Sequence, residues 1–168
     1  MIKFVLNYSH SQGRETSLLR HENAERQINT DIAIYLEDIT MKEYKKFYVC
    51  EHCGNVVEKV NDAGVPVVCC GQKMIELVPG TVEASREKHL PAVSVEENIV
   101  HVSVGSVEHP MVEEHSILWV YLQTDKGGQM KYLAVGESPA VDFALAGEKP
   151  VAVFAYCNLH GLWRTDLE

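Results

Sequence analysis

Four of the five cysteines lie close together, and this cluster constrains the fold more strongly than any other feature of the sequence. Two of them form Cys50-x-x-Cys53, and the other two are the adjacent pair Cys69-Cys70. Four thiolates can enclose a zinc ion or a single iron, and the ligand types leave both metals open. Adjacent cysteines reach one ion only if the backbone twists, and Gly71 after the pair can provide that freedom. The alternatives to a metal site are a vicinal disulfide or idle thiols.

The segment that carries this cluster, residues 41–80, has too few apolar residues for a core of its own. A metal ion would therefore have to hold it together. Short β-like runs at 46–49, 56–60 and 65–68 predict a small β domain, which ends at the turn 78–80.

Residues 81–168 have the pattern of an all-β domain. Val100, Val102 and Val104 alternate with polar residues, and residues 117–122 form a nearly continuous apolar run, as in a strand of a sandwich core. The sequence 126–128, Lys-Gly-Gly, predicts a hairpin turn, and alternation returns at 141–145 and 151–155. We expect a β-sandwich of roughly seven strands.

The fifth cysteine, Cys157, stands alone near the C-terminus, three residues before a histidine. With three histidines upstream it suggests a second, mixed thiolate–imidazole metal site. All of the candidate ligands fall near the ends of predicted strands, where the loops of a sandwich can converge: His89, His109, His115, Cys157 and His160. A blue-copper site is a weaker interpretation. Such a site uses two histidines, two fewer than the candidates here, and usually an axial methionine, which does not follow Cys157. We interpret His10, His21, His52 and His101 as structural or neutral.

Charge and hydropathy exclude several classes of partner. The net charge of −9 argues against nucleic acid or an anionic membrane surface. No apolar run approaches the ~20 residues of a membrane span, and residues 1–6 lack the features of a signal peptide. We therefore expect a cytoplasmic protein, in which clustered cysteines are metal ligands rather than disulfides.

Residues 1–40 form an N-terminal extension to which we assign no function. One hypothesis is that Met41 is the true start, because Glu37-Asp38 can be encoded by a purine-rich string that resembles a ribosome-binding site. The alternative is a real appendage for regulation or association.

Several motifs together resemble desulfoferrodoxin, the two-iron form of superoxide reductase. They are Tyr48-x-Cys50-x-x-Cys53-Gly54, Cys69-Cys70-Gly71, Glu87-Lys88-His89-x-Pro91, Gly105-Ser106-Val107-x-His109-Pro110-Met111, His115 and the run from Tyr156 to Trp163. The resemblance covers about residues 41–168. It implies a desulforedoxin-like domain at 41–80 followed by an immunoglobulin-like sandwich at 81–168, usually as a homodimer supplied with electrons by a rubredoxin-type donor.

The resemblance also implies two iron ions and the residues that hold them. Cys50, Cys53, Cys69 and Cys70 would bind the first iron. Around the second, four histidines (His89, His109, His115 and His160) would be equatorial and Cys157 axial, with His160 bound through a different ring nitrogen from the other three. The backbone N–H groups of Asn158 and Leu159 would bond the Cys157 sulfur.

The implied activity is the one-electron reduction of superoxide to hydrogen peroxide at the open sixth position of the second iron. Lys88 would attract the anion and deliver protons through water, and Glu87 would occupy the open position in the oxidised state. Two other functions are considered beside this oxidoreductase. One is an electron carrier in which neither iron is catalytic, and the other is a zinc-ribbon binding module.

Overall fold

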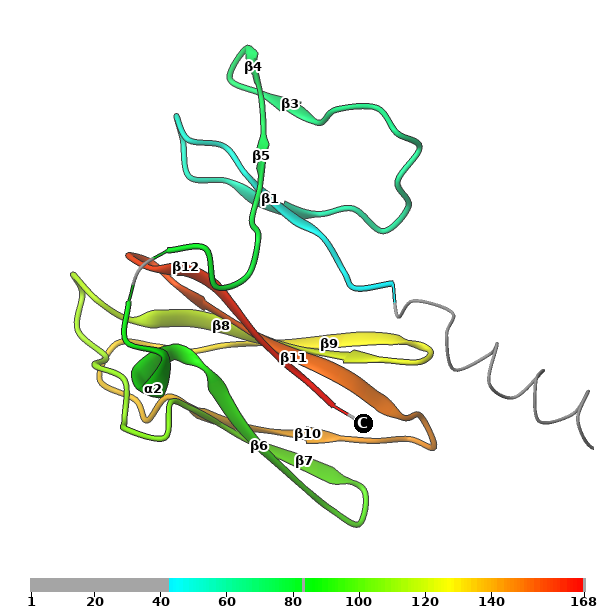
Figure 1. The fold of residues 1–168 in the computed structure, drawn as a ribbon, viewed down its shortest axis with the longest axis vertical. Coiled ribbons are helices and arrows are strands. Elements are labelled where there is room, and N and C mark those ends of the chain that lie inside the picture. The colour runs from blue at the N-terminus through cyan, green and yellow to red at the C-terminus, as the bar shows by residue number, and fades with distance from the viewer. Residues whose placement is uncertain (1–42, 83, 168) are drawn as a thin grey trace, which may run out of the picture. The chain divides into compact units, whose positions relative to one another are not determined.

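The computed structural model describes residues 43–82 and 84–167, so the predicted extension lies outside the described residues. The described chain is almost entirely β, as the sequence predicts. Its first part consists of short antiparallel strands (Figure 1). They are β1 (Phe47–Val49), β2 (Val56–Glu58), β3 (Val68–Cys69), β4 (Gln72–Lys73) and β5 (Ile75–Glu76). One sheet has the order β2-β1-β5, and β3 pairs with β4 as a separate hairpin.

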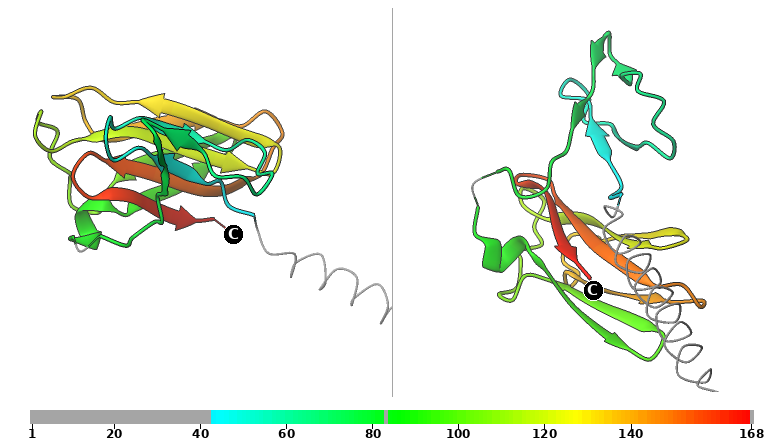
Figure 2. Two further views of the ribbon diagram at one scale, coloured as in Figure 1. Left: turned by 90° about the horizontal axis from the view of Figure 1, so that it is seen from above. Right: turned by 45° about the vertical axis from the view of Figure 1, so that its right-hand side comes forward.

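The second part is a seven-stranded antiparallel sandwich, preceded by the short helix α2 (Arg86–His89). Its strands are β6 (Pro91–Glu96), β7 (Ile99–Val104), β8 (Ile117–Thr124), β9 (Gly127–Tyr132), β10 (Ala140–Ala144), β11 (Pro150–Cys157) and β12 (Gly161–Asp166). One sheet has the order β10-β7-β6 and the other β12-β11-β8-β9. The green pair β6–β7 and the orange-red pair β11–β12 lie in different layers in Figure 1 and in the right-hand view of Figure 2.

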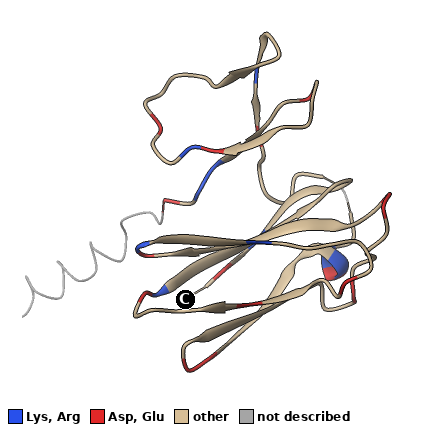
Figure 3. Ribbon diagram, turned by 180° about the vertical axis from the view of Figure 1, so that it is seen from behind, with Lys and Arg blue, Asp and Glu red and all other residues tan. Residues whose placement is uncertain are grey.

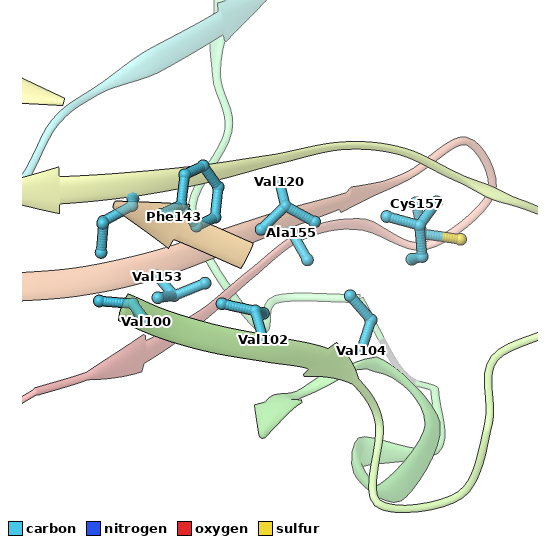
Figure 4. Close-up of a cluster of buried hydrophobic side chains, with 10 residues drawn as sticks. Val100, Val102, Val104, Val120, Phe143, Val153, Ala155 and Cys157 are labelled. Atoms are coloured by element: carbon cyan, nitrogen blue, oxygen red, sulfur yellow. The ribbon is translucent and has the colours of Figure 1, made fainter. Parts of the chain in front are cut away.

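The core between the two sheets follows the period of two that a strand imposes on its side chains. Val100, Val102 and Val104 of β7 are buried and meet a set of equally buried residues from β8, β10 and β11, including Val120, Phe143, Val153 and Ala155. Figure 4 shows this cluster, with Cys157 at one end and its sulfur directed away from the valines.

The strand β8 is buried on both faces, which explains its nearly continuous apolar run. Val120 and Leu122 face the sandwich core, whereas Trp119 and Tyr121 belong to a second apolar cluster with Phe47 of β1. The Phe47 ring lies 5.0 Å from Trp119 and 5.4 Å from Tyr121 between centroids. One aromatic side chain of the cysteine-bearing part is therefore packed into the second part.

The structure differs from the sequence prediction at the hairpin after β8. Gly127 and Gly128 are the first residues of β9 rather than the turn. A Cβ atom built on Gly128 would lie 2.1 Å from the Tyr121 hydroxyl oxygen, so this glycine leaves room for the cross-strand ring. Among the described residues, no helix has the length and apolar character needed to span a membrane.

Candidate metal centres

The first candidate centre gathers the four clustered cysteines. Their sulfur atoms all lie within 4.8 Å of one another. Cys50 follows β1, and the turn to Cys53 is closed by a hydrogen bond from Gly54 N–H to the Cys50 carbonyl at 2.8 Å. Cys50 is buried and Cys53 is exposed.

The adjacent pair is accommodated by the two-residue turn between β3 and β4. Cys69 pairs with Gln72, and the two residues between them, Cys70 and Gly71, have φ of 51° and 78°. Two successive positive φ values are typical of the tight hairpin turns that suit twisted strands. The expected backbone twist is thus shared by Cys70 and Gly71. It allows the sulfurs of Cys69 and Cys70 to lie in the same cluster.

In the metal-free state, Cys50 and Cys70 differ in how readily they lose their protons. A hydrogen bond from the Cys53 backbone N–H is the main cause that lowers the pKa of Cys50 to about 7. The hydrogen bond with Cys53 raises the pKa of Cys70 to about 12. Four converging sulfurs are suited to a closed site for a soft or borderline cation, which iron or zinc satisfies.

The second candidate centre brings together the five residues expected to form it. His89 ends α2, His109 lies on the loop after β7, His115 precedes β8, Cys157 ends β11 and His160 lies in the turn before β12. One ligand atom from each of the first four lies within 4.8 Å of the others. The Nδ1 atom of His160 is 2.9 Å from His89 Nε2, 3.1 Å from His115 Nε2 and 3.6 Å from Cys157 Sγ.

The four imidazoles form a closed ring in the order His89, His109, His115, His160. Neighbouring ring centroids are 4.4–4.7 Å apart, and neighbouring planes are inclined by 74–79°. Two nitrogens at right angles around a metal, each bonded at about 2.0–2.1 Å, would be about 2.9 Å apart. The separations of 2.9 and 3.1 Å therefore fit one metal ion.

Hydrogen bonds fix the tautomers of two of these histidines. Nδ1 of His89 lies 2.7 Å from the Ser85 carbonyl and Nδ1 of His109 lies 2.6 Å from the Pro110 carbonyl, so both nitrogens carry the proton. The Nε2 atom of each is then unprotonated and carries a lone pair that can bind a metal. His109 Nε2 is buried and has no hydrogen-bond partner among the described residues. Such a group in a native structure calls for an explanation, and a bound metal ion supplies one.

Burial favours the neutral form of three of the histidines and disfavours a free thiolate. It lowers the pKa of His89 and His115, and it lowers the pKa of His109 to about 4. Burial raises the pKa of the Cys157 thiol. A thiolate at this position needs a nearby cation, and neutral imidazoles can bind the same one. A register irregularity between Tyr156 and Cys157 accompanies the placement of this sulfur.

Comparison with known proteins identifies the family. The family model described as Desulfoferrodoxin matches residues 81–166, and that of the Desulfoferrodoxin N-terminal domain matches residues 42–77. The chain belongs to the desulfoferrodoxin family. It is 40% identical over 126 residues to the desulfoferrodoxin of Nitratidesulfovibrio vulgaris, covering 75% of this chain and 99% of the relative. It is 41% identical over 125 residues to a desulfoferrodoxin homolog of Archaeoglobus fulgidus, covering 74% and 99%.

A solved structure similar to this desulfoferrodoxin-family chain is the superoxide reductase from Treponema pallidum. The TM-score is 0.64 at 37% sequence identity, and the match covers 75% of this chain and all of the other. The family and this likeness confirm the predicted desulforedoxin-like part and the all-β fold.

Glu87 and Lys88 are exposed on α2 beside His89. Their catalytic roles in this desulfoferrodoxin-family member stay predictions. Figure 3 shows charges of both signs on this helix. After burial and His160, the positive charge of Lys88 also contributes to the lowered pKa of His89 and His115. The Lys88 ammonium group therefore acts electrostatically on the imidazoles of His89 and His115.

The structure differs from expectation at Asn158. Its backbone N–H donates to the Ser116 carbonyl at 3.1 Å and is not directed at the sulfur. The backbone N–H groups of His160 and Leu159 lower the pKa of the Cys157 thiol and so partly offset the effect of burial. The expected role of Leu159 toward the Cys157 sulfur stays a prediction.

The other histidines of the described chain are not part of this centre. His52 is exposed, and His101 lies on β7 with its Nδ1 2.7 Å from an Asp142 carboxylate oxygen. His10 and His21 lie outside the described residues.

Trp163 is a residue to which the sequence analysis gave no role. Its Nε1–H donates to the His160 carbonyl at 3.1 Å, and its ring stacks on His89 at 5.0 Å. Its position three residues after His160 is the signal in the sequence that could have indicated this contact.

Proposed function

We propose that this chain reduces superoxide to hydrogen peroxide, consuming one electron and two protons, with iron held by four histidines and Cys157. The observation that carries the proposal is the closed ring of four imidazoles beside a thiol, in which the buried Nε2 of His109 has no partner among the described residues. The likeness to the superoxide reductase of Treponema pallidum supports it. Bound iron would supply the electron, and five protein donors would leave one position for a small anion.

The buried ligands would prepare the site for this chemistry. The lowered pKa values of His89, His109 and His115 keep these three imidazoles neutral, with a lone pair each, at neutral pH. The Cys157 thiolate would donate electron density, and the N–H groups of His160 and Leu159 would limit that donation.

The exposed charges of α2 would handle the anion and its protons. A chain of net charge −9 repels superoxide at long range, so a local positive group is needed. Lys88 would attract the anion and pass protons to it through water. Glu87, its neighbour, would occupy the open position when the centre is oxidised.

The cluster of four cysteines would hold a second iron that stores or passes electrons. A rubredoxin-type protein is the proposed external donor, and the proposed assembly is a homodimer. These assignments come from the family and extend the proposal beyond the site itself.

Metal analysis, optical spectra and pulse-generated superoxide test this function together. We expect two irons per chain, rapid oxidation of the reduced second centre by superoxide, and loss of its thiolate band in Cys157→Ser. Lys88→Ala should slow the encounter about tenfold with little change in the spectrum, because it removes local attraction. The matched control is Lys73→Ala, an exposed lysine on β4. Zinc at both centres, or a reduced protein inert toward superoxide, would falsify the proposal.

A further inference from the structure

Asn158 connects two loops of the second centre through several hydrogen bonds. Its side-chain Oδ1 accepts from the Ser116 N–H at 3.0 Å, and its Nδ2 donates to the carbonyls of Glu113 at 3.3 Å and Glu114 at 3.2 Å. Its backbone N–H donates to the Ser116 carbonyl at 3.1 Å. One residue therefore makes four hydrogen bonds to the segment 113–116.

These bonds lie directly beside two of the candidate ligands. Asn158 follows Cys157 in the chain, and Ser116 follows His115. Ser116 is buried, with 2% of its surface exposed, so its N–H depends on the Asn158 oxygen for a partner. The side chain of Asn158 thus ties the position of His115 to that of Cys157.

His115 needs such support more than the two buried histidines do. His89 and His109 are each oriented by a ring N–H bond to a carbonyl. Within residues 43–82 and 84–167, the second ring nitrogen of His115 has no such bond. Its loop is fixed instead by the paired backbone bonds with Val112, both 3.1 Å, and by Asn158.

We infer that Asn158 is a positioning residue, whose side chain holds His115 in register with Cys157 and so sets the metal affinity and ligand field of the second centre. The inference rests on the proposed function for the identity of the metal. Residues that orient metal ligands from behind change metal affinity by roughly 10–100-fold when removed.

Two substitutions separate the parts of this contact. Asn158→Ala removes the three side-chain bonds to segment 113–116 and the 3.9 Å contact between Cys157 Sγ and Asn158 Oδ1, and it keeps the backbone bond to Ser116. Asn158→Asp keeps an acceptor for the Ser116 N–H but loses both donors, and it places a carboxylate oxygen beside the carbonyls of Glu113 and Glu114. Asn61→Ala, at an exposed loop residue, is the matched control.

The test is the release of iron to EDTA from the full-length, iron-loaded protein, followed at the separate absorption bands of the two centres. We expect Asn158→Ala to release the iron of the second centre at about tenfold lower EDTA concentration, and to shift its thiolate band. The cysteine cluster is the internal control and should be unchanged. Equal loosening of both centres, or release indistinguishable from Asn61→Ala, overturns the inference.

Amide hydrogen exchange of Ser116 in the metal-free protein gives a second readout. Protection should fall in Asn158→Ala and persist in Asn158→Asp, and equal protection in wild type and Asn158→Ala also overturns the inference. A wild-type centre that holds iron but is inert toward superoxide would contradict the proposed function and leave this role of Asn158 standing. Iron release from the Asn158 variants at the same EDTA concentration as wild type would contradict the role of Asn158 and leave the proposed function standing.

Discussion

His109 shows how a single buried residue can destabilise the metal-free protein. The ring is 2% exposed, one nitrogen donates to Pro110, and the other has no partner among the described residues. A buried polar atom without a partner costs about 1–3 kcal/mol. Binding of a metal ion at this atom would relieve that cost, so metal affinity and folding stability are linked here.

The same residue predicts how the stability of the metal-free protein depends on pH. Burial lowers the pKa of His109 to about 4, whereas a histidine in the unfolded chain has a pKa of about 6.5. Between these values the unfolded chain binds a proton that the folded protein does not. The stabilising contribution is therefore complete above about pH 6.5 and is lost as the pH falls toward 4.

Urea unfolding of the metal-free protein between about pH 7 and pH 5 measures this effect. We expect the free energy of unfolding to fall less steeply in His109→Gln than in wild type. His52→Gln, at an exposed turn residue, controls for the loss of a histidine. Equal slopes for wild type and His109→Gln would contradict the prediction.

At the scale of elements, the turn after β7 fixes the segment that carries Glu87 and Lys88. Gly105 has φ of 86°, and its N–H donates to the Leu90 carbonyl at 3.1 Å. Val107 N–H donates to the Glu87 carbonyl at 2.9 Å. A Cβ atom on Gly105 would lie 2.6 Å from the Lys88 carbonyl oxygen, so this close approach requires glycine.

Two glycine substitutions separate backbone strain from steric conflict. Gly147 has φ of 76° and open space around it, so Gly147→Ala should cost about 1–2 kcal/mol from its left-handed backbone alone. Gly105→Ala carries the same strain and also forces backbone atoms apart, so its total cost should reach about 4 kcal/mol. Urea unfolding measures both, and equal losses would show that the turn tolerates a methyl group.

The elements also show how far the sequence alone could lead. The alternation in β7 and the apolar run of β8 are local patterns, and the structure has both strands where these patterns predict them. The ends of strands indicated which histidines could converge, but not their order around the ring. That order and the Asn158 contacts depend on residues far apart in the chain. Gly128 is predicted to lie in the turn because glycine is typical of turns, and its close approach to Tyr121 on β8 cannot be seen in the local sequence.

At the scale of the whole described chain, Phe47 is a fully buried contact between the cysteine-bearing strands and the sandwich. It is 1% exposed and packs on Trp119, Tyr121 and Phe154. Phe47→Ala should lower the free energy of unfolding by about 3–5 kcal/mol, as expected for an aromatic side chain removed from a core.

Unfolding of this variant should be followed by Trp fluorescence and by the absorption of the cysteine-bound metal. Both signals should move to lower denaturant concentration, because Phe47 packs against residues of both parts. Val60→Ala, at a residue 82% exposed, is the control. A shift in the metal signal alone would show that the sandwich does not depend on Phe47.

The packing of Phe47 also has a consequence for synthesis on the ribosome, where the N-terminal part of a chain emerges first. All four clustered cysteines precede residue 71, whereas the aromatic residues that cover Phe47 belong to β8 and β11, much later in the chain. While those strands are still being made, β1 has its apolar face uncovered. During that interval, the emerged segment 43–77 already contains the sheet β2-β1-β5 and all four clustered cysteines, so an ion bound by the cysteines can stabilise it before β8 and β11 are made.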